Sequence, residues 1–391
     1  MKAFNFTNIE KILVIKLRHI GDVLLTVPVY RALRENFPNA HISALVNSGT
    51  EEVLSGNSLI NEIIIFDRNI KRLNVIQKYI KELSFLKNIR KKSFDLAVDL
   101  TSGDRAAIIS FLSGASYRIA HDPNGNGFWG KRYLYTHIAI KERGSQHIVL
   151  RNLDVIRQFG IDTENTQVDF FIPEDARMFV KKIFKENNIN NLPSPPFDSP
   201  LTKEGYRGIK GRQTGVKVIH VHPISRALFK CWKDEYMAEV IRWLVNKRLK
   251  VVVTSSPEKH EVEKAKNILS LVDKLTPPDI PPLVREGIGK VIDLCGKTSI
   301  KQLAAVAEAS DLFLGVDSAP MHIAAAVGTP VIAIMGAGKD SWSPWGKGHV
   351  VLFKDAVSRN GISRKERIKR ILLQIRPEDV IEEVKRLLFI K

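Results

Sequence analysis

Short β-branched runs alternate with amphipathic segments along both halves of this 391-residue chain, and no other feature constrains its fold as strongly. In the first half, the runs that we expect to form buried parallel strands span residues 11–17, 41–46, 62–66 and 95–100. The same pattern returns in the second half over residues 217–223, 250–257, 290–296, 311–318 and 330–336. Strands that alternate with helices predict parallel sheets with helical crossovers. The predicted fold class is therefore α/β, with two Rossmann-like domains.

The domain boundaries follow from two Pro/Gly-rich segments that resemble each other and that we interpret as surface insertions of common origin. We assign residues 1–190 to the first domain and residues 191–214 to a linker or insertion. The second domain covers residues 215–375, with the other Pro/Gly-rich segment as a loop insertion at 276–290. We expect a C-terminal helix within residues 376–391 to pack back on the first domain.

The spacing of apolar residues predicts individual helices within this pattern. One helix follows Asp22 and ends at the turn around residues 36–39, and a second carries its apolar face between Met237 and Val245. The C-terminal helix has Pro377 in its first turn and acidic residues near its positive end.

Cysteine usage and hydropathy exclude several classes of protein. Cys231 and Cys295 lie in different segments and not at metal-ligand spacing, so we expect no structural zinc site. The N-terminus lacks the apolar core of a signal peptide, and the apolar stretch at 323–338 is short and contains Pro330. We therefore expect a cytoplasmic protein whose membrane contact is at most peripheral.

The charge balance favours anionic partners. The chain has 60 Lys and Arg against 42 Asp and Glu, a formal net charge of +18. Phosphates, nucleic acid and a membrane surface would all attract such a chain. No helix-turn-helix, aromatic RNA-binding strand or zinc-finger pattern occurs, and the basic residues are spread along the sequence, so we expect no nucleic-acid partner.

The loop after the first strand carries the first candidate site. Gly21 and Asp22 lie where the following helix begins, which is the ligand-binding end of a Rossmann unit, although a GxGxxG fingerprint is absent. Asp22 can be a helix N-cap, a carboxylate that faces a ligand, or both. Lys16, Arg18 and His19 make this loop cationic, and ordinary solvated charge is the alternative for each.

A second candidate site follows the strand at 217–223. Its loop brings the hydroxyl of Ser225, the guanidinium of Arg226 and the ammonium of Lys230 close together in sequence. These groups could hold a diphosphate. The alternative is a basic surface loop with Trp232 buried.

The most informative run spans residues 313–336. Asp317 and Ser318 stand at a strand end, Pro320 lies where a helix can begin, and His322 falls in its first turn. Backbone N–H groups, a hydroxyl and an imidazole around one point suit the phosphates and sugar of a nucleotide-sugar. A core histidine with Asp317 as a simple N-cap is the alternative.

Two glutamates after the strand at 250–257 complete the set of candidates. Glu258 or Glu261 could accept hydrogen bonds from ribose hydroxyls. Both are otherwise ordinary exposed helix residues.

Three motifs in order give the chain a family resemblance. KILVIKLRHIGDVLLTVPVYRALRENFP, HPISRALFKCW and GVDSAPMHIAAAVGTPVIAIMG resemble the ADP-heptose:lipopolysaccharide heptosyltransferases, glycosyltransferase family 9. The HPxSRxxFKxW form is most similar to the heptosyltransferase III branch. The resemblance covers nearly the whole chain except the two Pro/Gly-rich segments.

The resemblance implies a GT-B fold, in which the first domain binds an acceptor, the second binds a nucleotide-sugar, and no metal is required. The family's catalytic aspartate falls on Asp22, and its lysine at the end of the first strand falls on Lys16. Its donor-binding hydroxyl and lysine fall on Ser225 and Lys230, and its Asp-Ser/Thr-x-x-x-His motif begins at Asp317. Its ribose-binding glutamate falls on Glu261 or Glu258.

The implied activity is transfer of heptose from ADP-heptose to the lipid A–inner-core acceptor of lipopolysaccharide. Asp22 would be the general base of an inverting reaction, Lys16, Arg18 and His19 would contact the acceptor, and the ADP-sugar would be a co-substrate with no further cofactor.

Three alternatives remain at this stage. The chain could be a different GT-B enzyme, either a transferase of UDP- or GDP-sugars or a nucleotide-sugar epimerase. From another class, it could be a nucleic-acid-binding module. It could also be a catalytically silent scaffold, which the joint presence of Asp22 and the His322 motif disfavours.

Overall fold

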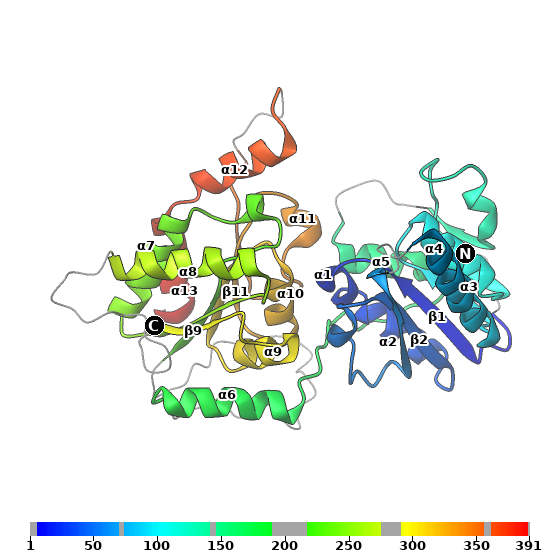
Figure 1. Ribbon diagram of the computed structural model, residues 1–391, viewed down its shortest axis with the longest axis horizontal. Coiled ribbons are helices and arrows are strands. Elements are labelled where there is room, and N and C mark those ends of the chain that lie inside the picture. Colours follow the sequence, from blue (N-terminus) through cyan, green and yellow to red (C-terminus); the bar gives the residue numbers. More distant parts are fainter. Residues whose placement is uncertain are drawn as a thin grey trace. The chain divides into compact units, whose positions relative to one another are not determined.

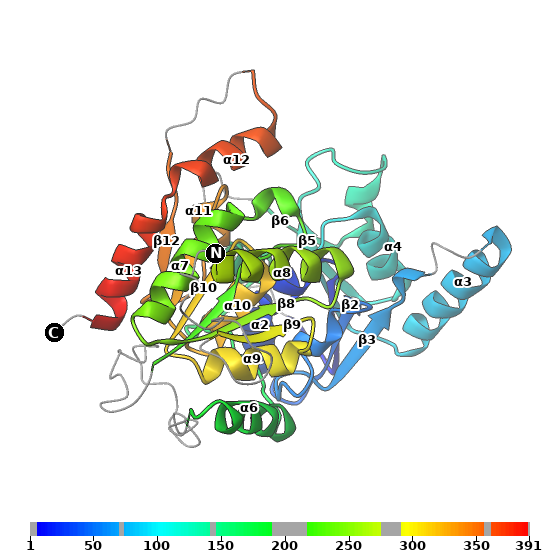
Figure 2. The ribbon, with the colours of Figure 1, turned by 60° about the vertical axis from the view of Figure 1, so that its left-hand side comes forward.

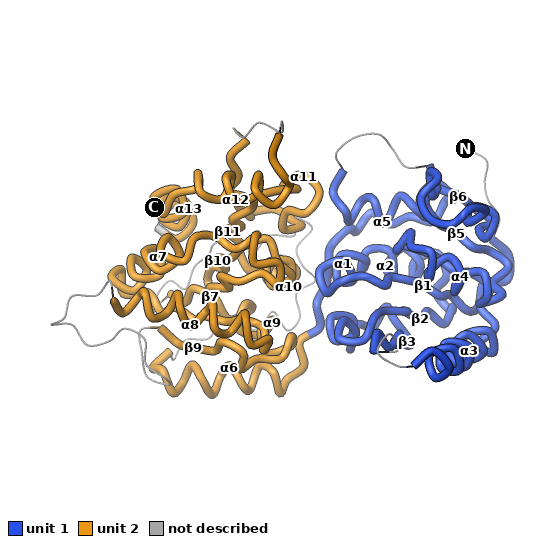
Figure 3. Tube along the Cα trace, turned by 45° about the horizontal axis from the view of Figure 1, so that its top comes forward, with its two compact units in different colours: residues 1–171 blue, residues 172–391 orange. Residues whose placement is uncertain are grey.

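The computed structural model of the chain describes residues 6–69, 74–140, 146–189, 217–274, 291–355 and 361–389. The chain divides into two compact units, residues 1–171 and 172–391 (Figures 1 and 3). Both proposed Pro/Gly-rich insertions, 191–214 and 276–290, lie outside the described residues.

Unit 1 contains a six-stranded parallel sheet with the order β3-β2-β1-β4-β5-β6. Its strands are β1 (Lys11–Lys16), β2 (His41–Asn47), β3 (Glu62–Phe66), β4 (Leu96–Asp99), β5 (Tyr117–His121) and β6 (His137–Ala139). In β1 every residue after Lys11 is buried, as expected for a central strand with helices on both faces. Four of the strands were predicted; β5 and β6 were not.

The helices of unit 1 follow the strands in sequence. They are α1 (Ile20–Leu24), α2 (Val27–Asn36), α3 (Val75–Lys91), α4 (Asp104–Leu112) and α5 (Ile148–Arg157), with 3-10 turns η1 (Glu51–Val53) and η3 (Lys131–Leu134). The single helix predicted after Asp22 is wrong, because α1 ends before Thr26 and α2 begins at Val27. Pro28 in the first turn of α2 has no N–H to donate, which is tolerated only where a helix begins.

Unit 2 repeats the same sheet topology. Its strand order is β12-β11-β10-β7-β8-β9, and all its pairings are parallel. Read from the β9 edge, with β7 counted as the first strand, this is the same order as in the first sheet. The strands are β7 (Val218–His222), β8 (Lys250–Ser255), β9 (Val291–Cys295), β10 (Leu312–Val316), β11 (Val331–Ile334) and β12 (Val350–Leu352). The prediction of two Rossmann-like units with parallel sheets is confirmed.

The helices of unit 2 cover both faces of this sheet, because Leu312 and Leu314 of β10 join the buried cluster of α7, whereas Phe313 between them joins that of α10. They are α6 (Glu174–Glu186), α7 (Asp234–Asn246), α8 (Lys259–Lys274), α9 (Ile300–Glu308), α10 (Ala319–Ala326), α11 (Lys339–Trp342), α12 (Arg364–Gln374) and α13 (Pro377–Phe389), with the 3-10 turn η4 (Leu228–Lys230).

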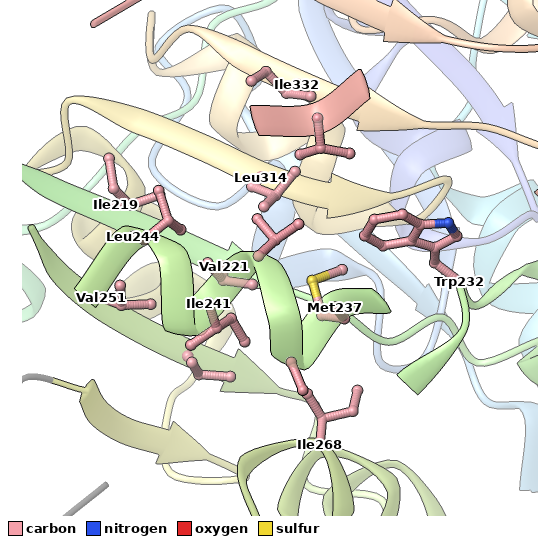
Figure 4. Close-up of a cluster of buried hydrophobic side chains, with 14 of the residues drawn as sticks. Ile219, Val221, Trp232, Met237, Ile241, Leu244, Val251, Ile268, Leu314 and Ile332 are labelled. Carbon is pink, nitrogen blue, oxygen red and sulfur yellow. The ribbon is translucent and has the colours of Figure 1, made fainter. Parts of the chain in front are cut away.

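The largest buried apolar cluster of unit 2 joins α7 and α8 to the sheet (Figure 4). Met237, Ile241 and Leu244 of α7 point toward β7, where Ile219 and Val221 are fully buried. The apolar spacing that predicted this helix is therefore the spacing of its core face.

The C-terminal helix packs on unit 2, so the expectation that it packs on the first domain is wrong. Val380 and Val384 of α13 are fully buried in the α7 cluster, and Leu387 and Leu388 extend the contact. Helix α13 contacts α7 and the strands β11 and β12. The apolar face of α13 is therefore covered by residues of unit 2.

The expected boundary after residue 190 also differs from the observed division at residue 171. Helix α6 packs on α9, and Arg177 binds Glu308 through two hydrogen bonds of 2.9 and 3.1 Å. These contacts place α6 in unit 2 although it precedes the second sheet in sequence.

Candidate functional site

The strand order of unit 1 reverses between β1 and β4, and this switch point is where ligands bind in open parallel sheets. The segment after β1 carries Arg18, His19 and Asp22, and the segment after β4 carries Thr101. Four of the predicted site residues, counting Lys16 at the end of β1, therefore belong to the edge of the sheet that the topology selects.

Asp22 lies in the first turn of α1 and is half-buried. The N-cap of this helix is His19, whose side chain makes no capping hydrogen bond, so the interpretation of Asp22 as an N-cap is wrong. Within the described residues the Asp22 carboxylate has no hydrogen bond and no ion pair. Its oxygens are therefore free to accept a proton or a hydrogen bond from a ligand.

Lys16 lies inside unit 1, at the end of β1 and only 3% exposed. Its ammonium donates to the carbonyl oxygen of Leu100 at 2.9 Å and to Oδ1 of Asn152 at 3.0 Å. Burial lowers the pKa of Lys16 to about 8, and the negative charge of Asp22 partly opposes that shift. Lys16 thus joins β1 to the neighbouring strand and to α5, and its predicted contact with an acceptor stays a prediction.

A pocket of about 260 Å³ opens beside Arg18 within unit 1. Its walls come from the carboxyl ends of the first four strands and the start of α4; the lining residues are Leu17, Arg18, Asn47, Phe66, Arg68, Thr101, Gly103, Asp104, Arg105 and Ala106. Sequence reasoning found only Arg18 among them. The signal that could have found Asn47, Arg68 and Thr101 is their position at or just after strand ends on the ligand-binding edge of the sheet.

Arg18 is fixed at the wall of this pocket by two contacts. Its guanidinium donates to the carbonyl oxygen of Thr101 at 3.0 Å, and its own carbonyl oxygen accepts from Nδ2 of Asn47 at 3.1 Å. His19 is exposed and does not line the pocket. The three predicted acceptor residues therefore differ in their surroundings: Lys16 is buried, Arg18 lines the pocket, and His19 is exposed outside it.

The charge of the pocket is positive. Arg105 pairs with Glu82 at 2.9 Å and Asp104 with Lys131 at 3.2 Å, whereas the Arg68 guanidinium has no ion pair in the described part of the chain. Arg18 likewise contributes a charge without a carboxylate partner there. The pocket suits an anionic group of modest size.

Asp99 holds the loop that forms one wall of the pocket. This buried carboxylate accepts from the Tyr135 hydroxyl at 2.6 Å and from the backbone N–H groups of Thr101 and Ser102 at 2.7 and 3.1 Å. Burial raises the pKa of Asp99, and these hydrogen bonds oppose the rise. The turn after β4 is thus rigidly placed.

In unit 2 the switch point lies between β7 and β10, and two predicted motifs follow these strands. Lys230 ends the η4 turn after β7, and Asp317 follows β10. The Lys230 ammonium donates to Oδ2 of Asp317 at 2.7 Å, with the side chains 29% and 14% exposed. Residues 87 positions apart in sequence therefore meet at the ligand-binding edge of this sheet.

The loop from Ser225 to Trp232 is closed by its own side chains. The Ser225 N–H donates to Sγ of Cys231 at 3.2 Å, and the thiol donates back to the Ser225 carbonyl oxygen at 3.7 Å. The buried Trp232 indole donates to the carbonyl oxygens of Leu372 and Ile375 at 3.1 and 3.0 Å. Ser225 is buried and Arg226 exposed, so the loop presents a fixed Ser225–Lys230 segment.

Helix α10 begins at the Lys230–Asp317 pair. Its N-cap is Ser318 rather than Asp317, so the alternative of Asp317 as an N-cap is wrong. The Ser318 hydroxyl donates back to the Val316 carbonyl oxygen at 3.2 Å and makes no capping bond. His322, one turn into the helix, is 5% exposed and faces the interior.

The structure separates the two candidate glutamates. Glu258 is exposed, whereas Glu261 in the first turn of α8 is only 4% exposed. The negative charge of Glu261 acts on the Cys231 thiol, which places it near the β7 loop. Its carboxylate makes neither a hydrogen bond nor an ion pair with any described residue. Of the two, only Glu261 is held in the interior of unit 2, and the ribose-binding role of either stays a prediction.

Two further histidines beneath this site are structural. Nε2 of His220 and Nδ1 of His222 both lie 2.8 Å from the Thr254 hydroxyl. Burial lowers the pKa of His222 to about 3 and that of His220 well below its ordinary value, so both are neutral. They join β7 to β8 and are not candidates for proton transfer at neutral pH.

Among the described residues, no cluster of His, Cys, Asp and Glu side chains could hold a metal ion. In the same part of the chain, no helix is both long and apolar enough to cross a membrane.

The chain is similar to known glycosyltransferases. A model of glycosyltransferase family 9 (heptosyltransferase) matches residues 82–370. The chain is 31% identical to lipopolysaccharide heptosyltransferase 3 of Escherichia coli K12 over 378 residues, which cover 95% of this chain and 96% of the relative.

Solved structures show the same fold. A glycosyl transferase family 9 protein from Veillonella parvula has a TM-score of 0.72 at 20% identity, with 97% of each chain covered. The E. coli heptosyltransferase WaaC with ADP-2-deoxy-2-fluoro heptose has a TM-score of 0.67 at 19% identity, covering 96% of this chain and 99% of that one. The predicted GT-B fold class is confirmed by these neighbours.

Proposed function

Because this chain belongs to glycosyltransferase family 9, the heptosyltransferases, we propose that it transfers heptose from ADP-heptose to the inner core of lipopolysaccharide. The chain is thus a glycosyltransferase, and its specific donor, acceptor and mechanism are what we propose. The observation that carries the proposal is the Lys230–Asp317 pair at the start of α10, where a cation and a helix N-terminus meet at the switch point of unit 2.

Unit 2 supplies the groups that a nucleotide-sugar needs. An ammonium has several N–H donors, so Lys230 can keep its bond to Asp317 while it donates to a diphosphate oxygen. Ser225 and the uncapped N–H groups of α10 add neutral donors. Glu261 can accept from the ribose hydroxyls. Together these groups stabilise the charge that develops on ADP as it leaves.

Unit 1 supplies the base. In the reaction that we propose, the acceptor hydroxyl oxygen forms a bond to the anomeric carbon while the bond from that carbon to the ADP oxygen breaks. The electron pair of the broken bond stays on the diphosphate, and the hydroxyl proton passes to Asp22. Attack opposite the leaving group inverts the anomeric configuration. The unpaired carboxylate of Asp22 supports this role.

The pocket beside Arg18 is where we propose that an anionic group of the acceptor binds. A phosphorylated lipid A–inner-core saccharide carries such groups, and Arg18 and Arg68 offer charges without carboxylate partners in the described residues. The formal net charge of +18 adds a longer-range attraction to a membrane that holds this acceptor. A peripheral position on the cytoplasmic face of the inner membrane follows from the same proposal.

A panel of sugar nucleotides tests the donor. The protein is incubated with an isolated inner-core acceptor and ADP-heptose, a UDP-sugar or a GDP-sugar, and the acceptor mass is measured. We expect the mass of one heptose to be added with ADP-heptose and the largest thermal stabilisation from the same compound. Faster transfer from a UDP- or GDP-sugar, or epimerisation of the donor without transfer, would establish the rival GT-B enzymes instead.

A further inference from the structure

Helix α3 of unit 1 exposes a stripe of large apolar side chains to solvent. Val75, Ile76, Tyr79, Ile80 and Leu83 are 61–73% exposed. At about 100° per residue, they occupy about 140° of the helix circumference. Single exposed apolar residues are ordinary, but a contiguous group of this size marks an interaction surface.

A different face attaches this helix to the unit. Ile89 is 1% exposed, and Phe85 packs edge-on against the Phe66 ring at 5.3 Å between centroids. Glu82 on the same side binds Arg105 at 2.9 Å. The exposed stripe is therefore not the core face of the helix, and folding of the unit does not require it.

The neighbouring elements expose further apolar side chains. Helix α4 contacts α3, and its outward residues Ile108, Phe111 and Leu112 are 39–47% exposed. The η3 turn also contacts α4. Tyr133 within η3 is 81% exposed, and Trp129 just before it is 96% exposed. Figure 2 shows α3 and α4 at the same end of unit 1. We call these residues of α3, α4 and η3 the apolar surface.

The charges around the apolar surface are positive. Helix α3 has five Lys and Arg residues against one Glu. Three acidic residues near the surface are ion-paired: Glu82 with Arg105, Asp104 with Lys131, and Asp122 with Arg132. Lys81, Lys87 and Lys91 of α3 are exposed; at about 100° per residue, Lys87 and Lys91 lie along one edge of the stripe and Lys81 lies on the opposite face of the helix.

We propose that the apolar surface docks unit 1 on a bilayer that contains anionic phospholipids. A helix with an apolar stripe, flanking lysines and nearby Trp and Tyr is the kind of element that lies in the headgroup region of a membrane. A second copy of the chain is a poorer occupant, since its own α3 would bring like charges together. The inference rests on the proposed function, in which the acceptor is a lipid.

The position of the arginine pocket agrees with this docking. Helix α4 begins at the pocket, where Arg105 and Ala106 are lining residues, and carries Ile108, Phe111 and Leu112 on its outward face. A bilayer that contacts α4 would therefore present anionic headgroups close to the pocket mouth.

Co-sedimentation of the full-length protein with vesicles tests the surface. The vesicles contain phosphatidylcholine alone or with phosphatidylglycerol. The triple variant Ile76→Ser, Ile80→Ser, Leu83→Ser removes the centre of the stripe, and Met178→Ser with Leu373→Ser removes apolar residues of unit 2 that are 58% and 47% exposed. We expect binding of the α3 variant to phosphatidylglycerol vesicles to fall about 10²-fold, since each side chain contributes up to about tenfold on leaving water. The unit 2 variant should bind as the wild type does.

A charge variant gives an independent readout. Lys87→Ser with Lys91→Ser should weaken the dependence on phosphatidylglycerol and on ionic strength that we expect of the wild type. Equal vesicle binding by the wild type and both α3 variants would overturn the proposal. So would light scattering that finds a wild-type dimer and a monomeric α3 variant whose vesicle binding is unchanged.

Turnover separates this inference from the proposed function. With a deacylated acceptor in solution, the stripe variant should transfer heptose at the wild-type rate, which also shows that it is folded. With the acceptor in vesicles, its rate should fall about as much as its binding. Vesicle binding without any heptose transfer would refute the proposed function and leave the surface standing, whereas transfer without wild-type vesicle binding would refute the surface alone.

Discussion

Replacement of Lys16 by methionine is expected to change how the stability of unit 1 depends on pH. Lys16 is 3% exposed, and burial lowers its pKa from 10.5 to about 8 in the folded protein. Between these two values the unfolded chain keeps the proton that the folded chain has lost. The unfolded state then binds more protons, so the free energy of unfolding rises with pH in this window.

The magnitude follows from the pKa difference. A pKa unit corresponds to about 1.4 kcal/mol, so between pH 7.5 and 9.5 the wild type should gain about 2 kcal/mol relative to Lys16→Met. The variant leaves the Leu100 carbonyl and the Asn152 side chain without their donor, which destabilises it at every pH. Those acceptors do not titrate here, so their cost cancels when the two pH values are compared.

Urea unfolding followed by far-UV circular dichroism measures this difference. The transition to analyse is the one that Lys16→Met shifts, because the two units need not unfold together. Lys11→Met, which replaces the exposed lysine at the other end of β1, controls for the loss of a positive charge. The free energy of unfolding of the wild type should rise relative to that of Lys16→Met as the pH increases. A difference between the two free energies that stays constant, or that shifts in favour of the variant, would refute the reasoning.

Three further predictions concern the two candidate binding sites. Lys230→Met should raise the dissociation constant of ADP about tenfold or more and lower turnover, since a charge-assisted hydrogen bond contributes about 1.5–3 kcal/mol; unchanged ADP titrations would contradict it. Glu261→Gln should weaken ADP binding about tenfold while Glu258→Gln leaves it unchanged, because only Glu261 is buried; calorimetry that finds the reverse order would exclude the assignment. Arg68→Gln should raise the KM for a phosphorylated acceptor about tenfold and leave the KM for ADP-heptose unchanged; an equal effect on both KM values in steady-state kinetics would show that Arg68 does not bind the acceptor.

The sequence predicts the central strands well because they are buried on both faces and read as continuous β-branched runs. It misses β5, β6 and β12, which lie toward or at the sheet edges. Tyr117 and Arg118 begin β5 and are half-buried, and β6 has three residues, so neither presents an apolar run. Helix α13 was predicted, but not its partner, because an apolar face does not say which surface will cover it.

The sequence likewise predicts one part of the candidate site and misses another. Motifs after β7 and β10 predicted the residues that the structure brings together, Lys230 and Asp317. The pocket of unit 1 escaped prediction because its residues come from four separate strand ends, and no short motif contains them. Lys16 looked like a surface cation because the sequence cannot show that Asn152, far along the chain, would receive its ammonium.

Single-turnover transfer from ADP-heptose by the wild type and by Asp22→Asn tests the central claim most directly. The substitution keeps the shape of the side chain and removes its ability to take a proton, so the rate should fall about 10²–10⁴-fold while the dissociation constant of ADP stays nearly the same. A variant that transfers heptose at the wild-type rate would show that Asp22 is not the base.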